Sequence, residues 1–488
     1  MPEVATTSTY DVIVIGAGST GENVAERAVQ GGLRAVVVES ELVGGECSYW
    51  ACMPSKALLR SGAALRAAQR TGGAAEAVTG TLDVEAVLAR RTSFTSDWDD
   101  SGQVTWLDDS GIDLVRGHGR LAGEKTVEVV ADDGSVSVLV ARHAVALSTG
   151  THAVVPDISG LRDAEPWTSR EAVSARAIPE SLTILGGGVV ACEMATVYTD
   201  LGCAVTMLVR DTLLARVEPF AGELVKEALE KRGVSIRRGV TATSVSRSDD
   251  GVTSTLDDGS TLTTAEFLVA AGREPRTEGL GLATVGLPAA GWLSVDDTLR
   301  VLDASGNPIG DWLYAVGDLN HRSLLTHQGK YQARAAGDVI VARATGAPVD
   351  DAPWGAHVAT ADHEAVPQVV FTDPEVAAVG LTADAATEAG YDTRVVDYDL
   401  GGVAGSALHA DGYAGKARLV VDEKRKVLLG ATFVGQDVSE LLHSATIAVV
   451  GEVPIARLWH AVPSYPTISE VWLRLLEEYR RTTSDQPR

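Results

Sequence analysis

The sequence predicts an α/β protein in which two strand–glycine loop–helix–strand units are followed by an α+β domain. An apolar run at 10–15 leads directly into GAGSTG, and a second run at 182–185 leads into GGGVVA. From about residue 355 onward, short strand patterns mix with helical ones. Continuous apolar runs are typical of parallel strands buried on both faces, so the first two units are expected to contain parallel sheets.

In the first unit, the strand YDVIVI precedes Gly16, Gly18 and Gly21 in the G-x-G-x-x-G positions. A helical pattern follows, and then a second strand that ends in Glu39. The glycines allow a tight turn and let the N–H groups at the helix start approach a pyrophosphate. Glu39 is placed to accept hydrogen bonds from a ribose, so this unit predicts a dinucleotide site.

The second unit repeats the pattern with Gly186, Gly188 and Ala191 in the same frame. Where the first unit has its glutamate, the second has Arg210, and Arg216 follows six residues later. A cation at this point suits the 2′-phosphate of NADP better than a free 2′-hydroxyl. The alternative is that both arginines are solvated surface charges.

Length and composition limit the possible classes of protein. A chain of 488 residues corresponds to about three domains. Its net charge of −25 argues against nucleic acid or an anionic membrane as a partner. No apolar run approaches the ~18 residues that span a bilayer, and the amino end has no secretory pattern. Four cysteines in so long a chain suit a reducing compartment, so we expect a cytoplasmic protein.

Two of the four cysteines, Cys47 and Cys52, lie close together in GGECSYWACMPSK. CxxxxC is not a common zinc spacing and no matching cysteine or histidine pair stands nearby, so we expect no metal site. Two interpretations stay open: a working thiol pair, which a reducing cytoplasm favours, or two unrelated buried thiols. Cys192 and Cys203 are expected to be buried thiols.

Further loops follow predicted strands. LVARHAVALSTG ends at Thr149 and Gly150, AEFLVAAGREP contains Gly272, and YAVG delivers Asp318 into a loop. Asp318 is either a helix cap or a ligand contact. Its position after a buried strand favours a ligand contact.

Six stretches of the sequence together resemble, in order, those of the flavoprotein pyridine nucleotide-disulfide oxidoreductases. They are GAGSTG, GGECSYWACMPSK, GGGVVACEMA, AAGREP, YAVGD and YPTISE. This group includes glutathione reductase, dihydrolipoamide dehydrogenase, mercuric reductase and soluble transhydrogenase. The resemblance covers nearly the whole chain. It implies two Rossmann-like dinucleotide-binding domains, for FAD and NADP, plus a C-terminal α+β dimerisation domain. The implied limits are 1–157 and 279–350 for FAD, 158–278 for NAD(P), and 351–488 for the interface of a homodimer.

By position, the resemblance implies two sets of cofactor contacts and an ion pair beside the flavin, formed by Lys56 and Glu193. The FAD contacts are Gly16, Gly18, Ser19, Gly21, Glu39, Gly45, Lys56, Gly119, Thr149, Gly150, Asp318 and Thr326. The NADPH contacts, with NADH as a possible second donor, are Gly186, Gly188, Val189, Val190, Glu193, Arg210, Arg216 and Gly272.

The resemblance also implies that Cys47 and Cys52 form a redox-active disulfide. Cys47 would attack the substrate, and Cys52 would face the flavin. The dipole of a helix start is expected to lower the thiol pKa. Electrons would pass from NADPH through FAD to the disulfide and on to a small-molecule acceptor.

The sequence departs from the family at its closing signature, SYPTISE. Tyr465 replaces the usual acid–base histidine, while Glu470, which orients that histidine, remains. A phenol has an ordinary pKa near ~10 against ~6.5 for imidazole, so it is a poor proton shuttle at neutral pH. His460 lies close in sequence and is an alternative. The catalytic set implied is Cys47, Cys52, Lys56, Glu193, Tyr465 and Glu470.

Three acceptors therefore stay open: a disulfide, a quinone or a metal ion. Val189, where many relatives have a tyrosine over the nicotinamide pocket, favours a quinone. Mercuric reductases have a carboxyl-terminal cysteine pair that RTTSDQPR lacks. The first rival function is a soluble pyridine nucleotide transhydrogenase, in which Cys52→Ser would keep full activity. The second is an FAD-binding redox sensor with little turnover.

Overall fold

The computed structural model describes residues 6–484, and these residues divide into two compact units. The first unit contains residues 6–54, 92–153 and 273–363. The second contains 55–91, 154–272 and 364–484. Each unit has its own sheets and core, so each is described by itself. The three-domain limits expected above stay a prediction.

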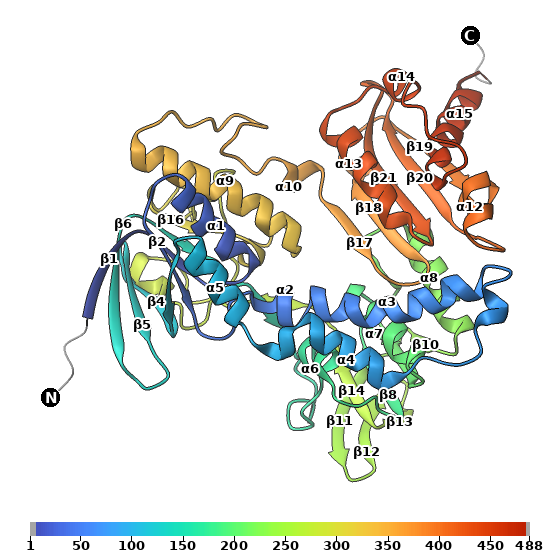
Figure 1. The fold of residues 1–488 in the computed structure, drawn as a ribbon, viewed down its shortest axis with the longest axis horizontal. Helices are drawn as coiled ribbons and strands as arrows, with labels where there is room; N and C mark the ends of the chain where they lie inside the picture. The colour runs from blue at the N-terminus through green and yellow to red at the C-terminus, as the bar shows by residue number, and fades with distance from the viewer. Residues whose placement is uncertain (1–5, 485–488) are drawn as a thin grey trace. The chain divides into compact units, whose positions relative to one another are not determined.

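The first unit is built on a seven-stranded sheet with the order β3-β2-β1-β6-β5-β4, to which β16 adds beside β6 (Figure 1). Strand β1 pairs in parallel with β2 and β6, β2 pairs in parallel with β3, and β6 pairs in parallel with β16. The other two pairs, β4 with β5 and β5 with β6, are antiparallel. The strand bounds are β1 Thr6–Ile15, β2 Ala35–Glu39, β3 Asp113–Arg116, β4 His118–Gly123, β5 Thr126–Val130, β6 Val136–Leu147 and β16 Leu313–Ala315.

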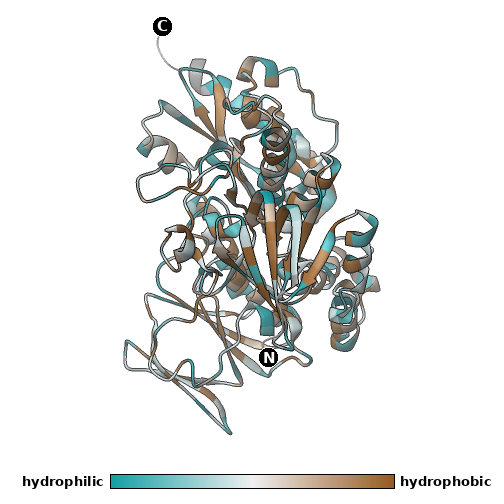
Figure 2. Cartoon of the chain, turned by 90° about the vertical axis from the view of Figure 1, so that its left-hand side faces the viewer, coloured by the Kyte–Doolittle hydropathy of each residue, from teal (hydrophilic) through white to brown (hydrophobic). Residues whose placement is uncertain are grey.

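Strand β1 explains why the apolar run is continuous. Ile13 and Ile15 pack into one buried cluster with Val38, while Val12 and Val14 pack into another on the opposite face of the sheet. Successive side chains of a strand point to opposite faces, so a strand covered on both sides needs apolar residues throughout. In Figure 2 several strands near the centre of the view are drawn largely in the hydrophobic colour.

Two helices of the first unit, α1 (Ser19–Gln30) and α9 (Thr326–Thr345), pack against each other (Figure 1). A Cβ on Gly337 of α9 would lie 2.4 Å from the Cβ of Arg27 on α1, so this close approach requires glycine. Further elements of the unit are α2 Gly45–Tyr49, α5 Ser101–Asp109, α10 Ala361–Glu364, and the paired strands β7 Thr151–Ala153 and β15 Arg273–Pro275. Helix α10 ends one residue into the second unit, as defined above.

The second unit contains a four-stranded parallel sheet, β10-β9-β8-β14, with a three-stranded antiparallel sheet, β11-β12-β13. Their bounds are β8 Ser181–Leu185, β9 Ala204–Val209, β10 Ser235–Arg238, β11 Ala242–Ser248, β12 Gly251–Leu256, β13 Thr261–Thr264 and β14 Glu266–Val269. The associated helices are α3 Cys52–Gln69, α4 Val84–Phe94, α6 Ser169–Ser174, α7 Val189–Asp200 and α8 Pro219–Lys231. Helix α3 begins at the end of the first unit.

The carboxyl-terminal part of the second unit is a five-stranded antiparallel sheet with the order β17-β18-β21-β20-β19. The bounds are β17 Pro367–Val370, β18 Glu375–Gly380, β19 Thr393–Asp399, β20 Lys416–Asp422 and β21 Val427–Gly435. Its helices are α11 Ala383–Glu388, α12 Ala404–His409, α13 Leu442–Val450, α14 Ile455–Leu458 and α15 Val471–Ser484. Across residues 6–484, no helix combines the length and apolar character needed to cross a membrane.

Candidate active site

The first glycine loop joins β1 to α1 and lies against the segment that carries the thiols. Gly18 is the N-cap of α1, and no side chain caps the N–H groups of the helix start. The Gly44 N–H donates to the Ala17 carbonyl at 2.8 Å, and a Cβ on Gly45 would lie 2.8 Å from the Gly18 Cα. The two segments therefore meet backbone to backbone, and the uncapped N–H groups suit a pyrophosphate.

Glu39 ties the end of β2 to the same loop. Its Oε2 accepts a hydrogen bond from the Ala17 N–H at 2.7 Å, and its Oε1 accepts one from the Glu41 N–H at 2.8 Å. Each carboxylate oxygen has a further lone pair. The side chain is thus held rigidly with acceptor capacity left for a ribose hydroxyl.

The other FAD contacts predicted in this unit lie mostly at the carboxyl ends of its parallel strands. Thr149 and Gly150 follow β6, and the Thr149 Oγ1 donates to the Arg276 carbonyl at 2.7 Å. Asp318 follows β16, and its Oδ2 accepts from the Thr151 Oγ1 at 2.7 Å, while burial raises the pKa of the Asp318 carboxyl. Gly119 packs on β2, since a Cβ on Gly119 would lie 2.9 Å from the Val38 Cγ1.

Adjacent parallel strands end at the same edge of a sheet, so the loops after β1, β2, β6 and β16 converge there. The predicted set thus gathers around one edge, with an uncapped helix start and glycines that admit close approach. This donor set fits FAD. Ser19, the first residue of α1, and Thr326, the first of α9, belong to the same unit.

The two thiols lie in this unit as well. Cys47 is in the five-residue helix α2, Cys52 begins α3, and both residues are in the thiol form. The Cys52 Sγ lies 3.2 Å from the Thr326 Oγ1. The Cys47 thiol is hydrogen-bonded to Cys52, which shows that the pair lies side by side.

The expectation that a helix dipole lowers the thiol pKa is wrong for Cys47. The hydrogen bond to Cys52 and the burial of the sulfur raise the pKa of Cys47 well above its usual value, although Thr326 and Lys330 act in the opposite direction. The physical reason is that a buried sulfur loses the water that would stabilise its charged form.

The implied ion pair of Lys56 and Glu193 forms within the second unit. The Lys56 Nζ donates to both carboxylate oxygens of Glu193, at 2.8 and 3.0 Å. The Phe371 N–H donates to the Oε1 at 3.1 Å, and the Lys56 ammonium lies 5.0 Å from the centre of the Phe371 ring. The Glu193 side chain is only 4% exposed against 36% for Lys56, so the pair satisfies an otherwise costly buried charge.

The second glycine loop has the same form as the first. Gly188 is the N-cap of α7, again without a side-chain cap, and Val189 and Val190 open the helix. Gly186 has a φ of +137° and a Cβ there would lie 2.3 Å from the Ala270 carbonyl oxygen. Gly272, with a φ of +136°, has open space around it. These features suit a second dinucleotide.

Arg210 and Arg216 follow strand β9 in this unit, and both side chains are exposed. Neither guanidinium takes part in any of the hydrogen bonds or ion pairs formed among residues 6–484. Both cations are therefore available to an anionic ligand.

No hydrogen bond joins Tyr465 to Glu470 among residues 6–484. The Tyr465 side chain is 76% exposed and has no hydrogen-bond partner among the described residues. Glu470 is buried, and its Oε1 accepts from the Arg474 Nη2 at 2.5 Å, while its Oε2 has no hydrogen-bond partner in the described part of the chain. His460 is also exposed.

Two charged residues of the first unit, Glu22 on α1 and Lys330 on α9, were not singled out from the sequence. Glu22 follows the third glycine of the loop and is buried together with Ala25, three residues further along α1. A carboxylate at that spacing within an apolar stripe is the signal that could have found it.

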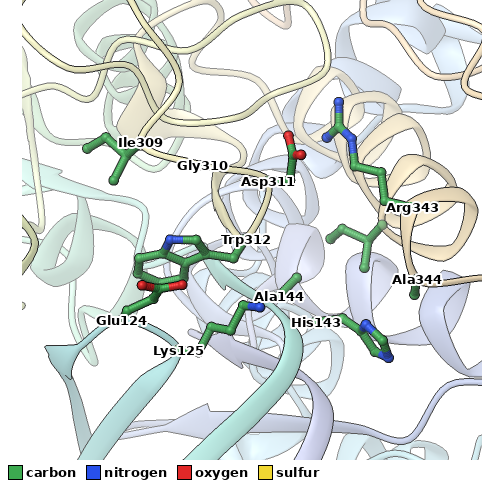
Figure 3. Close-up of a pocket in the computed structure, with 11 residues that line it drawn as sticks. Glu124, Lys125, His143, Ala144, Ile309, Gly310, Asp311, Trp312, Arg343 and Ala344 are labelled. Carbon is green, nitrogen blue, oxygen red and sulfur yellow. The ribbon is translucent and has the colours of Figure 1, made fainter. Parts of the chain in front are cut away.

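A separate cavity of about 450 Å³ lies in the first unit, near the start of β16 and the end of α9. Figure 3 shows Trp312, Glu124, Lys125 and His143 around it. No residue of the predicted sites lines this cavity. Among the residues that the structure describes, no group of three or more His, Cys, Asp or Glu side chains is arranged to hold a metal ion.

Comparison with known proteins agrees with this arrangement. Residues 10–339 match the family described as pyridine nucleotide-disulphide oxidoreductase, and residues 366–475 match its dimerisation domain. The chain is 32% identical to the dihydrolipoyl dehydrogenase of Haloferax volcanii over 487 residues, which cover 96% of this chain and 95% of that protein. It is 29% identical to the mercuric reductase of Staphylococcus aureus over 469 residues, which cover 94% of this chain and 81% of that protein.

Solved structures agree on the fold. The HOCl-induced flavoprotein disulfide reductase RclA of Escherichia coli, as its Cu(II) complex, has a TM-score of 0.81 at 22% identity, covering 96% of this chain and 99% of that one. LpdA of Mycobacterium tuberculosis has a TM-score of 0.80 at 24% identity, covering 98% and 100%.

The chain belongs to the pyridine nucleotide-disulphide oxidoreductase family, as the match across both regions shows. It is a flavoprotein disulfide oxidoreductase that binds FAD and a pyridine nucleotide. The predicted family, fold class and enzymatic nature are thereby confirmed.

Proposed function

We propose that the protein is an NADPH-dependent reductase whose electrons leave through Cys47 and Cys52 to a small-molecule acceptor, with a disulfide as the first class to test. The observation that supports this most is the pairing of the two thiols beside Thr326 at the edge of the FAD sheet. FAD, when bound, would pass an electron pair from the nicotinamide to the Cys47–Cys52 disulfide.

In the thiol half of the reaction, the Cys47 thiolate attacks an acceptor disulfide and releases its first thiol. Cys52 then attacks the Cys47 sulfur, releases the second thiol and restores the Cys47–Cys52 disulfide. Two electrons and two protons pass to the acceptor in each cycle. The Thr326 hydroxyl is placed to donate a hydrogen bond to the Cys52 thiolate.

Thr326→Val is expected to weaken this thiolate because the hydroxyl donor is lost. A hydrogen bond to a charged group contributes about 1.5–3 kcal/mol, so disulfide turnover should fall by roughly ten- to a hundredfold. The long-wavelength absorption of the reduced enzyme should weaken in parallel. Thr345→Val is the matched control, because the Thr345 Oγ1 bonds only within α9, to the Val341 carbonyl at 2.8 Å and the Ala342 carbonyl at 3.4 Å. Equal effects of both variants would contradict this role.

NADPH is proposed as the donor because Arg210 and Arg216, which follow β9, are exposed and form no hydrogen bond or ion pair with the other described residues. The double variant Arg210→Ala, Arg216→Ala should lower kcat/KM for NADPH by roughly a hundredfold or more, since each of the two charge-assisted hydrogen bonds contributes about 1.5–3 kcal/mol. The value for NADH should stay nearly unchanged. Arg176→Ala, which removes another exposed arginine of the second unit, is the control. An equal loss with both nucleotides would count against NADPH as the preferred donor.

A homodimer is proposed from the carboxyl-terminal region. This region exposes four large apolar or aromatic side chains, those of Leu408, Ile447, Val462 and Tyr465. Burial of such side chains against a second copy would remove their apolar surface from water. The match of this region to a dimerisation domain supports the same proposal.

The test of the function is an anaerobic titration of the FAD-loaded enzyme with NADPH and then NADH, followed by visible spectroscopy. Uptake of one electron pair with a long-wavelength band, while the flavin stays oxidised, would mean that Cys47 and Cys52 receive the electrons. Bleaching of the flavin without that band would favour a transhydrogenase. Oxidised lipoamide, a quinone and Hg(II) would then be compared as acceptors, and failure of all three would favour a redox sensor.

A further inference from the structure

Asp362, a buried carboxylate of the first unit, accepts hydrogen bonds from two glutamines of helix α9. It lies on α10, and its side chain is 0% exposed. The Gln328 Nε2 donates to its Oδ1 at 2.9 Å, and the Gln332 Nε2 donates to its Oδ2 at 2.8 Å. Both glutamines are buried and lie one turn apart on α9. A carboxylate accepts hydrogen bonds only, so both amides must turn their nitrogen toward it.

The other end of the Gln332 amide holds the turn that follows β16. Its Oε1 accepts from the Gly317 N–H at 2.8 Å and from the Asn320 Nδ2 at 2.8 Å. These two bonds use both lone pairs of the carbonyl oxygen. Asp318, the predicted FAD contact, lies between the two donors. One side chain of α9 therefore holds the turn at 317–320 at both of its ends.

The Gly317 N–H depends on this acceptor because the turn is tightly packed. Gly317 is buried and has a φ of +85°, a conformation that side chains rarely adopt. A Cβ on Gly317 would lie 3.0 Å from the Oγ1 of Thr20, the second residue of α1. The turn thus lies against the helix that follows the first glycine loop. A buried N–H without an acceptor is costly, so a change at Gln332 is expected to move the turn.

The orientation of the Gln332 amide is decided by Asp362. The oxygen and nitrogen of an amide are nearly equal in shape, so packing alone does not distinguish its two ends. If the Gln332 amide turned around, its nitrogen would face the two donors of the turn. Its oxygen would then face the carboxylate of Asp362, and three hydrogen bonds would be lost together.

The charged and titratable groups around Asp362 favour its ionised form at neutral pH. Burial raises the pKa of Asp362 to about 6, whereas the Arg322 charge, the two amides and His363 act in the opposite direction. The Arg322 Nη1 lies 3.9 Å from the Asp362 Oδ2. Asp297 accepts from the Arg322 Nη2 at 2.9 Å and lies 2.7 Å from the His363 Nε2, and Tyr331 of α9 also interacts with Asp362.

We propose that Asp362 and Gln332 are positioning residues of the FAD site. The Asp362 carboxylate fixes the orientation of the Gln332 amide, and the Gln332 carbonyl holds the turn that presents Asp318 to FAD. The inference rests on the predicted contact between Asp318 and FAD. It goes beyond the proposed function, since it concerns how firmly FAD is held, whichever donor and acceptor the enzyme uses.

The test exchanges the two groups in the variant Gln332→Glu, Asp362→Asn. A carboxylate at position 332 accepts from the turn and from the new amide at position 362, whose carbonyl accepts from Gln328. Every hydrogen bond keeps a donor and an acceptor, and the net charge is unchanged. Gln332→Glu alone sets two carboxylates against each other, and Asp362→Asn alone leaves two glutamine donors with one carbonyl.

Release of FAD is measured without turnover. The FAD-loaded variants are purified at pH 6.5 and diluted at pH 9, and the free FAD that passes a desalting filter is followed with time. Gln332→Glu should release FAD at least about tenfold faster than the parent, because buried groups of the turn lose their partners. Adding Asp362→Asn to this variant should bring the rate back to within about threefold of the parent, although Asp362→Asn in the parent speeds release.

The pH dependence distinguishes this role from a general loss of packing. Two buried carboxylates in contact share one proton, and a protonated group at position 332 donates to Asp362 as the amide does. Release of FAD from Gln332→Glu should therefore match that of the parent at pH 6.5 and become faster toward pH 9. The parent and the exchanged variant should lack this dependence.

Tyr314→Phe is the matched control, because it removes a buried hydroxyl of β16 that accepts from the Arg343 Nη1 at 2.6 Å, away from the turn. It should release FAD at the parent rate. Parent-like release from Gln332→Glu at pH 9 would overturn the proposal, as would an exchanged variant that is no slower than Gln332→Glu. Parent-like release from Asp318→Ala would also overturn it. None of these rates depends on disulfide reduction, so failure of the proposed function would leave them unchanged.

Discussion

Replacing Cys47 with serine is expected to abolish disulfide reduction, with a loss of roughly 1000-fold or more in kcat/KM. A thiolate is the attacking group, and a serine hydroxyl does not ionise at neutral pH. Cys52→Ser should also abolish this turnover, because no Cys47–Cys52 disulfide can form to receive electrons. The activity of both variants is measured as the steady-state reduction of oxidised lipoamide by NADPH.

The matched control is Cys203→Ser. The Cys203 side chain is buried, so a dissolved acceptor does not reach its thiol. Full activity of Cys52→Ser in hydride exchange between NADPH and an NAD analogue, with no disulfide reduction by the parent, would contradict the proposed function. The enzyme would then be a transhydrogenase.

Arg66→Met is expected to destabilise the second unit by about 3 kcal/mol, the lower end of the cost of breaking a buried ion pair. The Arg66 side chain, 12% exposed, bonds to the carboxylates of Asp200 and Asp373 and links α3, the end of α7 and the turn before β18. Arg70 still reaches Asp373 at 2.8 Å, and Arg232 reaches Asp200 at 3.4 Å, so the loss is partial. The apparent midpoint of urea unfolding measures it.

Arg60→Met is the control, because Arg60 is an exposed arginine on the same helix. Burial acts to raise the pKa of Asp373, but the Arg70 hydrogen bond and the Arg66 charge hold it below its usual value. A lowered folded-state pKa contributes stability above the unfolded pKa, and this is lost as the pH falls through the folded value. The difference between the parent and Arg66→Met should therefore shrink in acid. Equal midpoints for Arg60→Met and Arg66→Met at pH 7 would contradict the network's role.

The sequence by itself determined the family, the fold class and the two nucleotide-binding units. The glycine loops are local signals, since Gly16 and Gly186 occupy backbone conformations that side chains rarely adopt. The continuous apolar strands are equally local. The pairing of Lys56 with Glu193, 137 residues apart, came only through the resemblance, and the structure contains it.

The tertiary structure alone decided the electrostatics of the thiol site. From the sequence, Cys47 lies at a helix start, where the helix dipole would favour the thiolate. In the structure, the hydrogen bond to Cys52 and the burial of the sulfur raise the pKa of the Cys47 thiol instead. Desolvation depends on which helices cover a side chain, and the packing of α1 on α9 joins residues some 300 positions apart. That depth of burial cannot be read from local sequence.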